Sequence, residues 1–157
     1  LSAAVDDVVI VVAGTGPEEN RLRRAARERK IRIVFTGRVS EQDAPALYAA
    51  ADVFALPVVD RYFGLETEGL GVVLLEAAAC ERACVTGRSG GTPEAVIDGK
   101  TGLVIDARQE SELVGALARI LDGRDEAATM GRAGREHVAR NFSSSSPPTA
   151  LLSWLDR

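Results

Sequence analysis

The segment Val8-Val9-Ile10-Val11-Val12, followed by Ala13-Gly14-Thr15-Gly16-Pro17, sets the pattern of the fold. A continuous run of β-branched residues predicts a fully buried strand, and the glycines and proline after it predict a tight turn. A charged helix is expected over 18–30, because proline is well tolerated in the first turn of a helix. This succession of strand, turn and helix is the repeating unit of an α/β fold.

The same alternation continues along the chain. Further strands are expected at 31–35, 52–57, 83–86 and 103–105, and helices at 40–50, 70–80, 93–97, 109–121 and 125–141. Strands that alternate with helices pair in parallel through right-handed crossovers, so the predicted fold is an α/β, doubly wound parallel sheet. Ligands of such sheets bind at the carboxyl ends of the strands. The loops expected at that edge contain Gly14, Gly37, 57–71 and 87–91.

Composition excludes several classes of protein. The chain has 157 residues, 46% hydrophobic and 27% charged, which suits one globular domain with its own core. A net charge of −4 provides no basic field for nucleic acid. The apolar stretches are too short to span a bilayer and no signal peptide is visible, so a cytoplasmic location is expected. Cys80 and Cys84 lack a nearby histidine and are interpreted as buried thiols, not as a metal site.

Two glutamates mark the candidate site. Glu68 precedes the turn Gly69-Leu70-Gly71, and Glu76 lies in the apolar run that follows. A glycine-rich turn that enters a helix exposes backbone N–H groups, here those of 70–72, and the helix dipole makes this end attractive to a phosphate. Carboxylates accept hydrogen bonds from hydroxyls. N–H groups that can bind a phosphate therefore lie beside carboxylates that can bind hydroxyls. A ligand that contains both phosphates and hydroxyls, such as a nucleotide-sugar, is predicted.

Each of these residues also has a purely structural interpretation. Glu76 is the stronger candidate, because an unpaired carboxylate buried among its apolar neighbours would be costly, and the alternative is a glutamate on the helix surface. Glu68 can equally be an ordinary loop glutamate, and the glycines can be turn residues only.

Gly14-x-Gly16 is rejected as a dinucleotide fingerprint because Glu19 stands where a small residue is needed. His137, the only histidine, is interpreted as structural or solvated.

Three segments together resemble a known family. Glu68-x7-Glu76, Ala77-Ala78-Ala79-Cys80 and Ser89-Gly90-Gly91-Thr92-Pro93-Glu94 are similar to the donor-binding half of retaining family 4 glycosyltransferases of the GT-B fold. Leu65-Glu66-Thr67-Glu68-Gly69-Leu70-Gly71 is especially similar to actinobacterial phosphatidylinositol mannosyltransferases. The resemblance implies a Rossmann-like carboxy-terminal domain over 1–142. The chain departs from the family after this domain: Ser143-Ser144-Ser145-Ser146-Pro147-Pro148 is incompatible with a regular helix, so an irregular tail is expected over 143–157. The family continues here into a helix that packs on an amino-terminal, acceptor-binding domain preceding residue 1, and Trp154 would be the remnant of that helix.

The resemblance also implies a reaction and a set of roles. A hexose, with mannose from GDP-mannose as the favoured donor, would pass to a hydroxyl acceptor such as a glycolipid, without metal or a separate cofactor. Glu76 would hold the ribose hydroxyls of the donor and Glu68 the sugar that is transferred. Gly69, Leu70, Gly71 and Val72 would contact the sugar or phosphate through their backbone, and Gly37, Arg38 and Val39 would border the base. Cationic residues that clamp the diphosphate would precede Leu1, so the chain alone is expected to be inactive, and the missing domain would provide any peripheral contact with the membrane.

Two alternatives and three departures from the family pattern stay open. The alternatives are a UDP-sugar-dependent transferase of the same fold and a nucleotide-binding module without transferase activity. Glu81 stands where the family has glycine, and Arg82-Ala83 replaces Val-Pro, so the turn before the strand at 83–86 is expected to differ. Arg88 replaces a small residue in the loop that leads to Gly90-Gly91.

Overall fold

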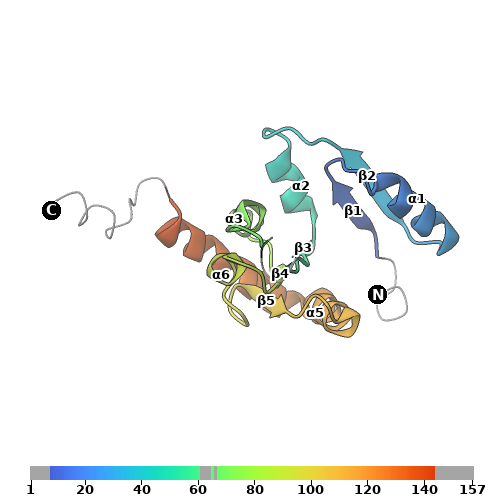
Figure 1. The fold of residues 1–157 in the computed structure, drawn as a ribbon. Helices are drawn as coiled ribbons and strands as arrows, with labels where there is room; N and C mark the ends of the chain where they lie inside the picture. The colour runs from blue at the N-terminus through green and yellow to red at the C-terminus, as the bar shows by residue number, and fades with distance from the viewer. Residues whose placement is uncertain (1–7, 61–64, 66, 144–157) are drawn as a thin grey trace. The chain divides into compact units, whose positions relative to one another are not determined.

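The computed structural model describes residues 8–60, 65 and 67–143, in two compact units, Leu1–Leu47 and Tyr48–Arg157 (Figure 1). Each unit is described by itself. The tail beyond Ser143, with Trp154, lies outside the described residues, and so does Glu66. In the part of the chain that is described, no helix is both long and apolar enough to cross a membrane.

The smaller unit contains a two-stranded parallel sheet. Its elements are β1 (Ile10–Ala13), α1 (Glu19–Glu28) and β2 (Ile33–Gly37). Along both strands half-buried and exposed residues alternate, and Val11 and Val34 remain 47% and 51% exposed. On the covered face, the Arg23 guanidinium of α1 lies 4.3 Å from the centre of the Phe35 ring. The prediction that the first strand is fully buried is therefore wrong, because within this unit α1 covers one face of the sheet.

The larger unit is built on a three-stranded parallel sheet. The helix α2 (Ala44–Ala50) crosses the boundary between the units and leads into β3 (Phe54–Leu56). The strand order is β3-β4-β5, and Cys84 of the central strand lies opposite both Phe54 and Gly102. The remaining elements are α3 (Val72–Ala79), β4 (Cys84–Gly87), α4 (Thr92–Ala95), β5 (Gly102–Ile105), α5 (Glu110–Asp122) and α6 (Arg124–Asn141).

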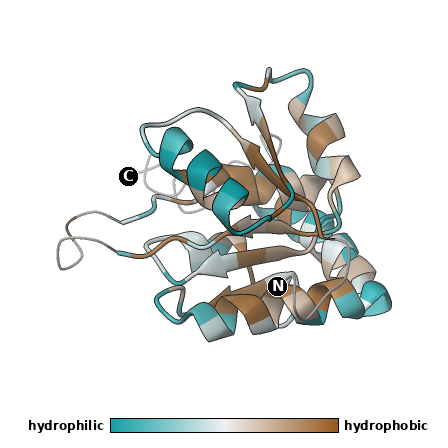
Figure 2. Ribbon diagram, turned by 90° about the vertical axis from the view of Figure 1, so that its right-hand side faces the viewer, coloured by the Kyte–Doolittle hydropathy of each residue, from teal (hydrophilic) through white to brown (hydrophobic). Residues whose placement is uncertain are grey.

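Side chains on both faces of this sheet are buried. On one face Val85 belongs to a cluster with Ile120 of α5 and Met130 of α6. On the other face Cys84 belongs to a cluster with Leu74 of α3 and with Val96. Hydrophobic residues accordingly concentrate in the strands and in the helix faces that cover them, whereas α1 of the smaller unit is mostly hydrophilic (Figure 2). Helices on both faces of a parallel sheet are the arrangement that the alternating pattern predicts.

The order and type of the elements agree with the sequence, and the strands are distributed over two sheets. The five strands and six helices expected from the alternation are all present, with bounds shifted by a few residues. The α/β class and the parallel pairing are confirmed. The strands form one sheet of β1 and β2 and another of β3, β4 and β5, whereas the alternation alone predicts a single sheet. The division into a domain over 1–142 and a tail stays a prediction.

The turn that ends α3 keeps the conformation that favours glycine. The N–H of Glu81 donates to the Ala78 carbonyl at 2.9 Å, and the N–H of Arg82 donates to the Ala77 carbonyl at 3.0 Å. These two bonds form a Schellman motif, whose residue after the C-cap is left-handed and usually glycine. Glu81 adopts this conformation with φ of 60°. The departure at residue 81 therefore changes the side chain in a left-handed turn and does not remove the turn.

Candidate functional site

The helix α3 begins at a left-handed glycine. Gly71 is the N-cap with φ of 73°, and its carbonyl accepts a hydrogen bond from the Leu74 N–H at 2.8 Å. A Cβ atom on Gly71 would lie 2.8 Å from Cδ1 of Leu74, whose side chain is fully buried. Val72 and Val73 are 60% and 37% exposed, and no described residue accepts a hydrogen bond from their N–H groups. The start of α3 is therefore open to an anion from outside.

The backbone of Glu68 and Gly69 packs directly on the loop after β4. The Gly91 N–H donates to the Gly69 carbonyl at 2.7 Å. Gly90 has φ of 48°, and a Cβ atom there would lie 1.8 Å from the Glu68 carbonyl oxygen. Only glycine allows this approach, because a side chain at position 90 would overlap the backbone of the other loop. The structure thus brings together two of the segments that carry the family resemblance.

A buried serine fixes the same loop through polar contacts. The Ser89 hydroxyl accepts a hydrogen bond from the Glu68 N–H at 3.0 Å and donates to Oδ1 of Asp60 at 2.5 Å. The Arg108 guanidinium in turn donates to the Asp60 carbonyl at 2.9 Å. Sequence reasoning missed Asp60 and Arg108. Asp60 lies in a loop that the strand pattern already places at the ligand edge, but nothing in the sequence signals the 48-residue separation across which Arg108 reaches it.

Glu76 is exposed on α3 and not buried. The helix buries Leu74, Ala77 and Ala78 and presents Glu76 to solvent. The expectation that apolar neighbours bury this carboxylate is therefore wrong, because a helix places successive residues on different faces. Its described partner is Tyr48, whose phenol donates to Oε2 of Glu76 at 2.8 Å. Among the residues that the structure describes, no cation pairs with the Glu76 carboxylate.

The segment predicted to border the base, 37–39, lies in the smaller unit at the carboxyl end of β2. Gly37 and Gly14 both have positive φ, 68° and 103°, and the Gly14 N–H donates to the Gly37 carbonyl at 2.8 Å. Arg38 is exposed and Val39 is half-buried. The two glycine turns thus meet at the same edge of the β1-β2 sheet, as expected for the carboxyl ends of neighbouring parallel strands.

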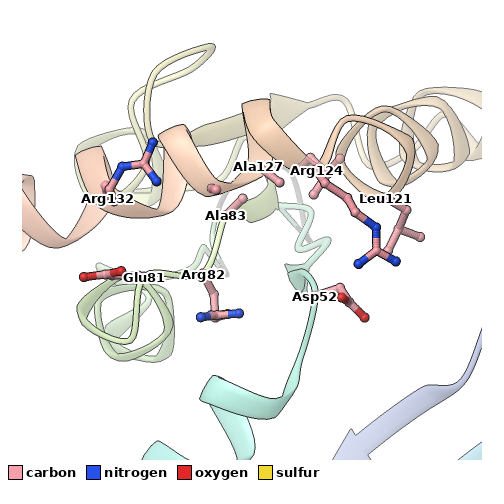
Figure 3. A pocket seen from close by; sticks show the side chains of 10 residues that line it. Asp52, Glu81, Arg82, Ala83, Leu121, Arg124, Ala127 and Arg132 are labelled. Atoms are coloured by element: carbon pink, nitrogen blue, oxygen red, sulfur yellow. The ribbon is translucent and has the colours of Figure 1, made fainter.

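A cavity of about 210 Å³ opens at the other end of the larger unit, near the amino end of β4 (Figure 3). Its charged lining is mixed in sign, with the carboxylates of Asp52 and Glu81 among arginine side chains. Arg82 is already engaged there, since its guanidinium donates to the carbonyls of Ala51 and Cys80. None of the predicted donor-binding residues lines this cavity, which is therefore separate from the candidate site.

The remaining chemically active side chains have structural partners. His137 is half-buried, with Nε2 2.8 Å from the Glu94 carbonyl and Nδ1 2.9 Å from the Asn141 amide, so the imidazole joins α6 to α4. Cys84 is fully buried, and this burial raises the pKa of its thiol to about 12. Cys80 is a free thiol that is only half-buried. Among the described residues, no group of three or more His, Cys, Asp or Glu side chains could hold a metal ion.

Comparison with known proteins identifies the family. The model of the family described as "Glycosyl transferases group 1" matches residues 1–137. The chain is 44% identical, over 140 residues, to the GDP-mannose-dependent alpha-(1-6)-phosphatidylinositol monomannoside mannosyltransferase of Mycobacterium tuberculosis. It is 42% identical, over 141 residues, to the GDP-mannose-dependent monoacylated alpha-(1-6)-phosphatidylinositol monomannoside mannosyltransferase of Corynebacterium glutamicum. These matches cover 88% and 90% of the chain but 36% and 37% of the relatives, so the chain spans about a third of their length.

Solved structures agree on the fold. Sucrose-phosphate synthase from Thermosynechococcus elongatus matches 94% of this chain and 37% of its own, with a TM-score of 0.77 and 26% identity. The carboxy-terminal domain of a group 1 family glycosyl transferase, LpcC, from Francisella tularensis matches 87% of this chain and 86% of its own, with a TM-score of 0.70 and 14% identity. The fold is thus that of a Rossmann-like domain of GT-B glycosyltransferases. The chain belongs to the group 1 family of glycosyl transferases.

Proposed function

We propose that this chain is the donor-binding domain of a retaining mannosyltransferase that uses GDP-mannose and a phosphatidylinositol mannoside acceptor. The support for this donor and this acceptor comes from the activities for which the relatives are named, and these relatives are 42% to 44% identical to the chain. Because the chain spans about a third of those relatives, an amino-terminal domain would supply the acceptor site and the cationic clamp for the diphosphate. The full-length protein would act at the inner face of the membrane, because a phosphatidylinositol mannoside acceptor is a lipid.

One observation carries the proposal: an open helix start and an exposed carboxylate one turn further along the same helix. Val72 and Glu76 are four residues apart, so their side chains are neighbours on the surface of α3. Four residues correspond to about 6 Å along a helix. A phosphate at the N–H groups of 72 and 73 would therefore leave the ribose hydroxyls near Glu76. A plain phosphate-binding module has no need of this carboxylate.

The geometry also indicates how the chain would assist the reaction. As the bond between the sugar and the diphosphate breaks, negative charge develops on the leaving phosphate. Fixed N–H groups and the positive end of the α3 dipole would stabilise that charge without reorganising. Glu68 would hold the hydroxyls of the sugar. The bond from the Glu68 N–H to the Ser89 hydroxyl and the bond from the Gly91 N–H to the Gly69 carbonyl would keep Glu68 in place during transfer.

The first test concerns the ribose contact. Replacing Glu76 with alanine in the full-length protein should weaken GDP binding by about 1.5–3 kcal/mol, the scale of a hydrogen bond to a charged group. Calorimetric titration with GDP measures the loss. Glu136→Ala is a suitable control, because Glu136 is exposed on α6 and pairs with Arg140. Equal affinity in the Glu76→Ala variant and the wild type would exclude Glu76 from the donor site.

The second test separates the sugar from the nucleotide. Glu68→Gln should leave the affinity for free GDP nearly unchanged, because the proposed contact is to the mannose and not to the nucleotide. The rate of mannose transfer should fall by about tenfold or more, because the contact is to the group that moves. Transfer rate and GDP affinity are measured on the same variant. Parallel losses of both quantities would place Glu68 on the nucleotide instead.

The two alternatives remain distinguishable by the same measurements. A UDP-sugar-dependent transferase of this fold would bind UDP more tightly than GDP. A nucleotide-binding module without transferase activity would bind GDP and lose affinity in the Glu76→Ala variant, yet would transfer no mannose in the full-length form. The identity to GDP-mannose-dependent relatives favours the proposed donor over both.

A further inference from the structure

Tyr48 holds the carboxylate of Glu76 from a different part of the chain. The phenol lies in the last turn of α2, 28 residues before Glu76, and donates to Oε2 at 2.8 Å. A carboxylate oxygen accepts about two hydrogen bonds. As far as the described residues go, no other group bonds to this carboxylate, so Oε1 and one lone pair of Oε2 are enough for two adjacent ribose hydroxyls.

The tyrosine ring is itself held firmly. It packs edge-on against Phe54 of β3, with ring centres 5.4 Å apart and planes at 75°. Both rings pack against the core cluster that contains Leu74 and Cys84. Burial, followed by the hydrogen bond to Glu76, raises the pKa of the Tyr48 phenol above its ordinary value. The phenol therefore stays protonated, and remains a hydrogen-bond donor, over the whole physiological range of pH.

An exposed glutamate without such a partner would move among several rotamers. Ordering a free glutamate side chain costs up to about 2 kcal/mol of conformational entropy. Among the described residues Glu76 has no ion pair, and Tyr48 is the one side chain that restricts its carboxylate through a hydrogen bond. A ligand that binds to a carboxylate already held in one position avoids part of this cost.

We propose that Tyr48 is a positioning residue, which fixes the Glu76 carboxylate so that Oε1 faces the ribose hydroxyls of the donor nucleotide. This inference rests on the proposed function, since it gives Tyr48 a role only if Glu76 binds ribose. A tyrosine with a purely structural role would stabilise the fold through its ring. Its phenol would then have the same effect on the affinity for nucleotides with and without ribose hydroxyls.

Tyr48→Phe tests the inference, because it removes the phenol oxygen and keeps the ring that packs on Phe54. In the full-length protein this variant should bind GDP about three- to tenfold more weakly, the equivalent of one hydrogen bond. Its affinity for 2′,3′-dideoxy-GDP should equal that of the wild type, because that ligand has no hydroxyls for Glu76. In a Glu76→Ala background, Tyr48→Phe should have no further effect on GDP affinity. Thr129→Val, which removes a hydroxyl bonded only within α6, should leave GDP affinity unchanged.

The outcomes separate this inference from the proposed function. If Glu76→Ala weakens GDP binding and Tyr48→Phe does not, the positioning role is wrong and the ribose contact stands. If Tyr48→Phe weakens GDP and dideoxy-GDP equally, Tyr48 acts on the fold and not on the carboxylate, which also overturns the inference. If Glu76→Ala itself has no effect, the proposed ribose contact fails first, and the positioning role fails with it.

Discussion

The two ends of α3 both contain a left-handed residue, but the side chains there differ. At the start Gly71 has φ of 73° and no side chain, whereas at the end Glu81 has φ of 60° and a full glutamate. The start faces the proposed ligand, and a Cβ atom at Gly71 would press on the buried Leu74. At the end, the Glu81 backbone packs against Gly131 of α6, but the Glu81 side chain is exposed and lies 3.5 Å from Arg135. Backbone strain is thus tolerated at the end of the helix, whereas packing at the start requires glycine.

The largest expected effect is at the start of the helix. Gly71→Ala should lower the free energy of unfolding by about 2–3 kcal/mol, because it adds the cost of a left-handed alanine to a contact with Leu74. Urea denaturation measures this change. Gly115→Ala is the matched control: Gly115 lies inside α5 with open space around its Cβ position, so this variant should gain about 0.5–1 kcal/mol. A Gly71→Ala variant as stable as wild type would contradict the packing argument.

A smaller effect of opposite sign is expected at the end of the helix. Glu81→Gly should raise the free energy of unfolding by about 1 kcal/mol, because glycine adopts positive φ without the cost that glutamate incurs. The contact with Arg135 joins two largely exposed side chains and contributes little. Thermal denaturation should show a transition a few degrees higher. Glu81→Gln, which keeps the strained backbone and removes the charge, should leave the transition nearly unchanged; a gain equal to that of glycine would assign the effect to charge.

The sequence predicted the elements of this fold well and the contacts of the candidate site only in part. The alternation of β-branched runs with charged or alanine-rich segments is local, and the structure contains every element expected from it. Gly71 and Gly90 were also predictable, because a left-handed backbone and a close approach favour one residue type. The solvent exposure of Glu76 was not, since its apolar neighbours concealed which face of the helix it occupies.

Contacts across long sequence separations account for most of what could not be predicted. Tyr48 and Glu76 are 28 residues apart, and Ser89 and Asp60 are 29 residues apart. Each of these residues is ordinary in its local segment, and its role depends on which strands become neighbours. The burial of β1 on one face only also could not be predicted. It depends on how many helices cover the sheet, which the sequence of the strand itself does not specify.

The central claim is that the open start of α3 and the exposed Glu76 together bind a nucleoside diphosphate. Titration of GDP, UDP and ADP into the 157-residue chain, followed by amide NMR shifts, tests this claim most directly. With a net charge of −4, the chain repels an anionic nucleotide mildly, so binding should be weak. The claim predicts shifts that cluster at 69–76 and are largest with GDP. Shifts confined to other segments, or none at millimolar nucleotide, would contradict it, and larger shifts with UDP would overturn the choice of donor.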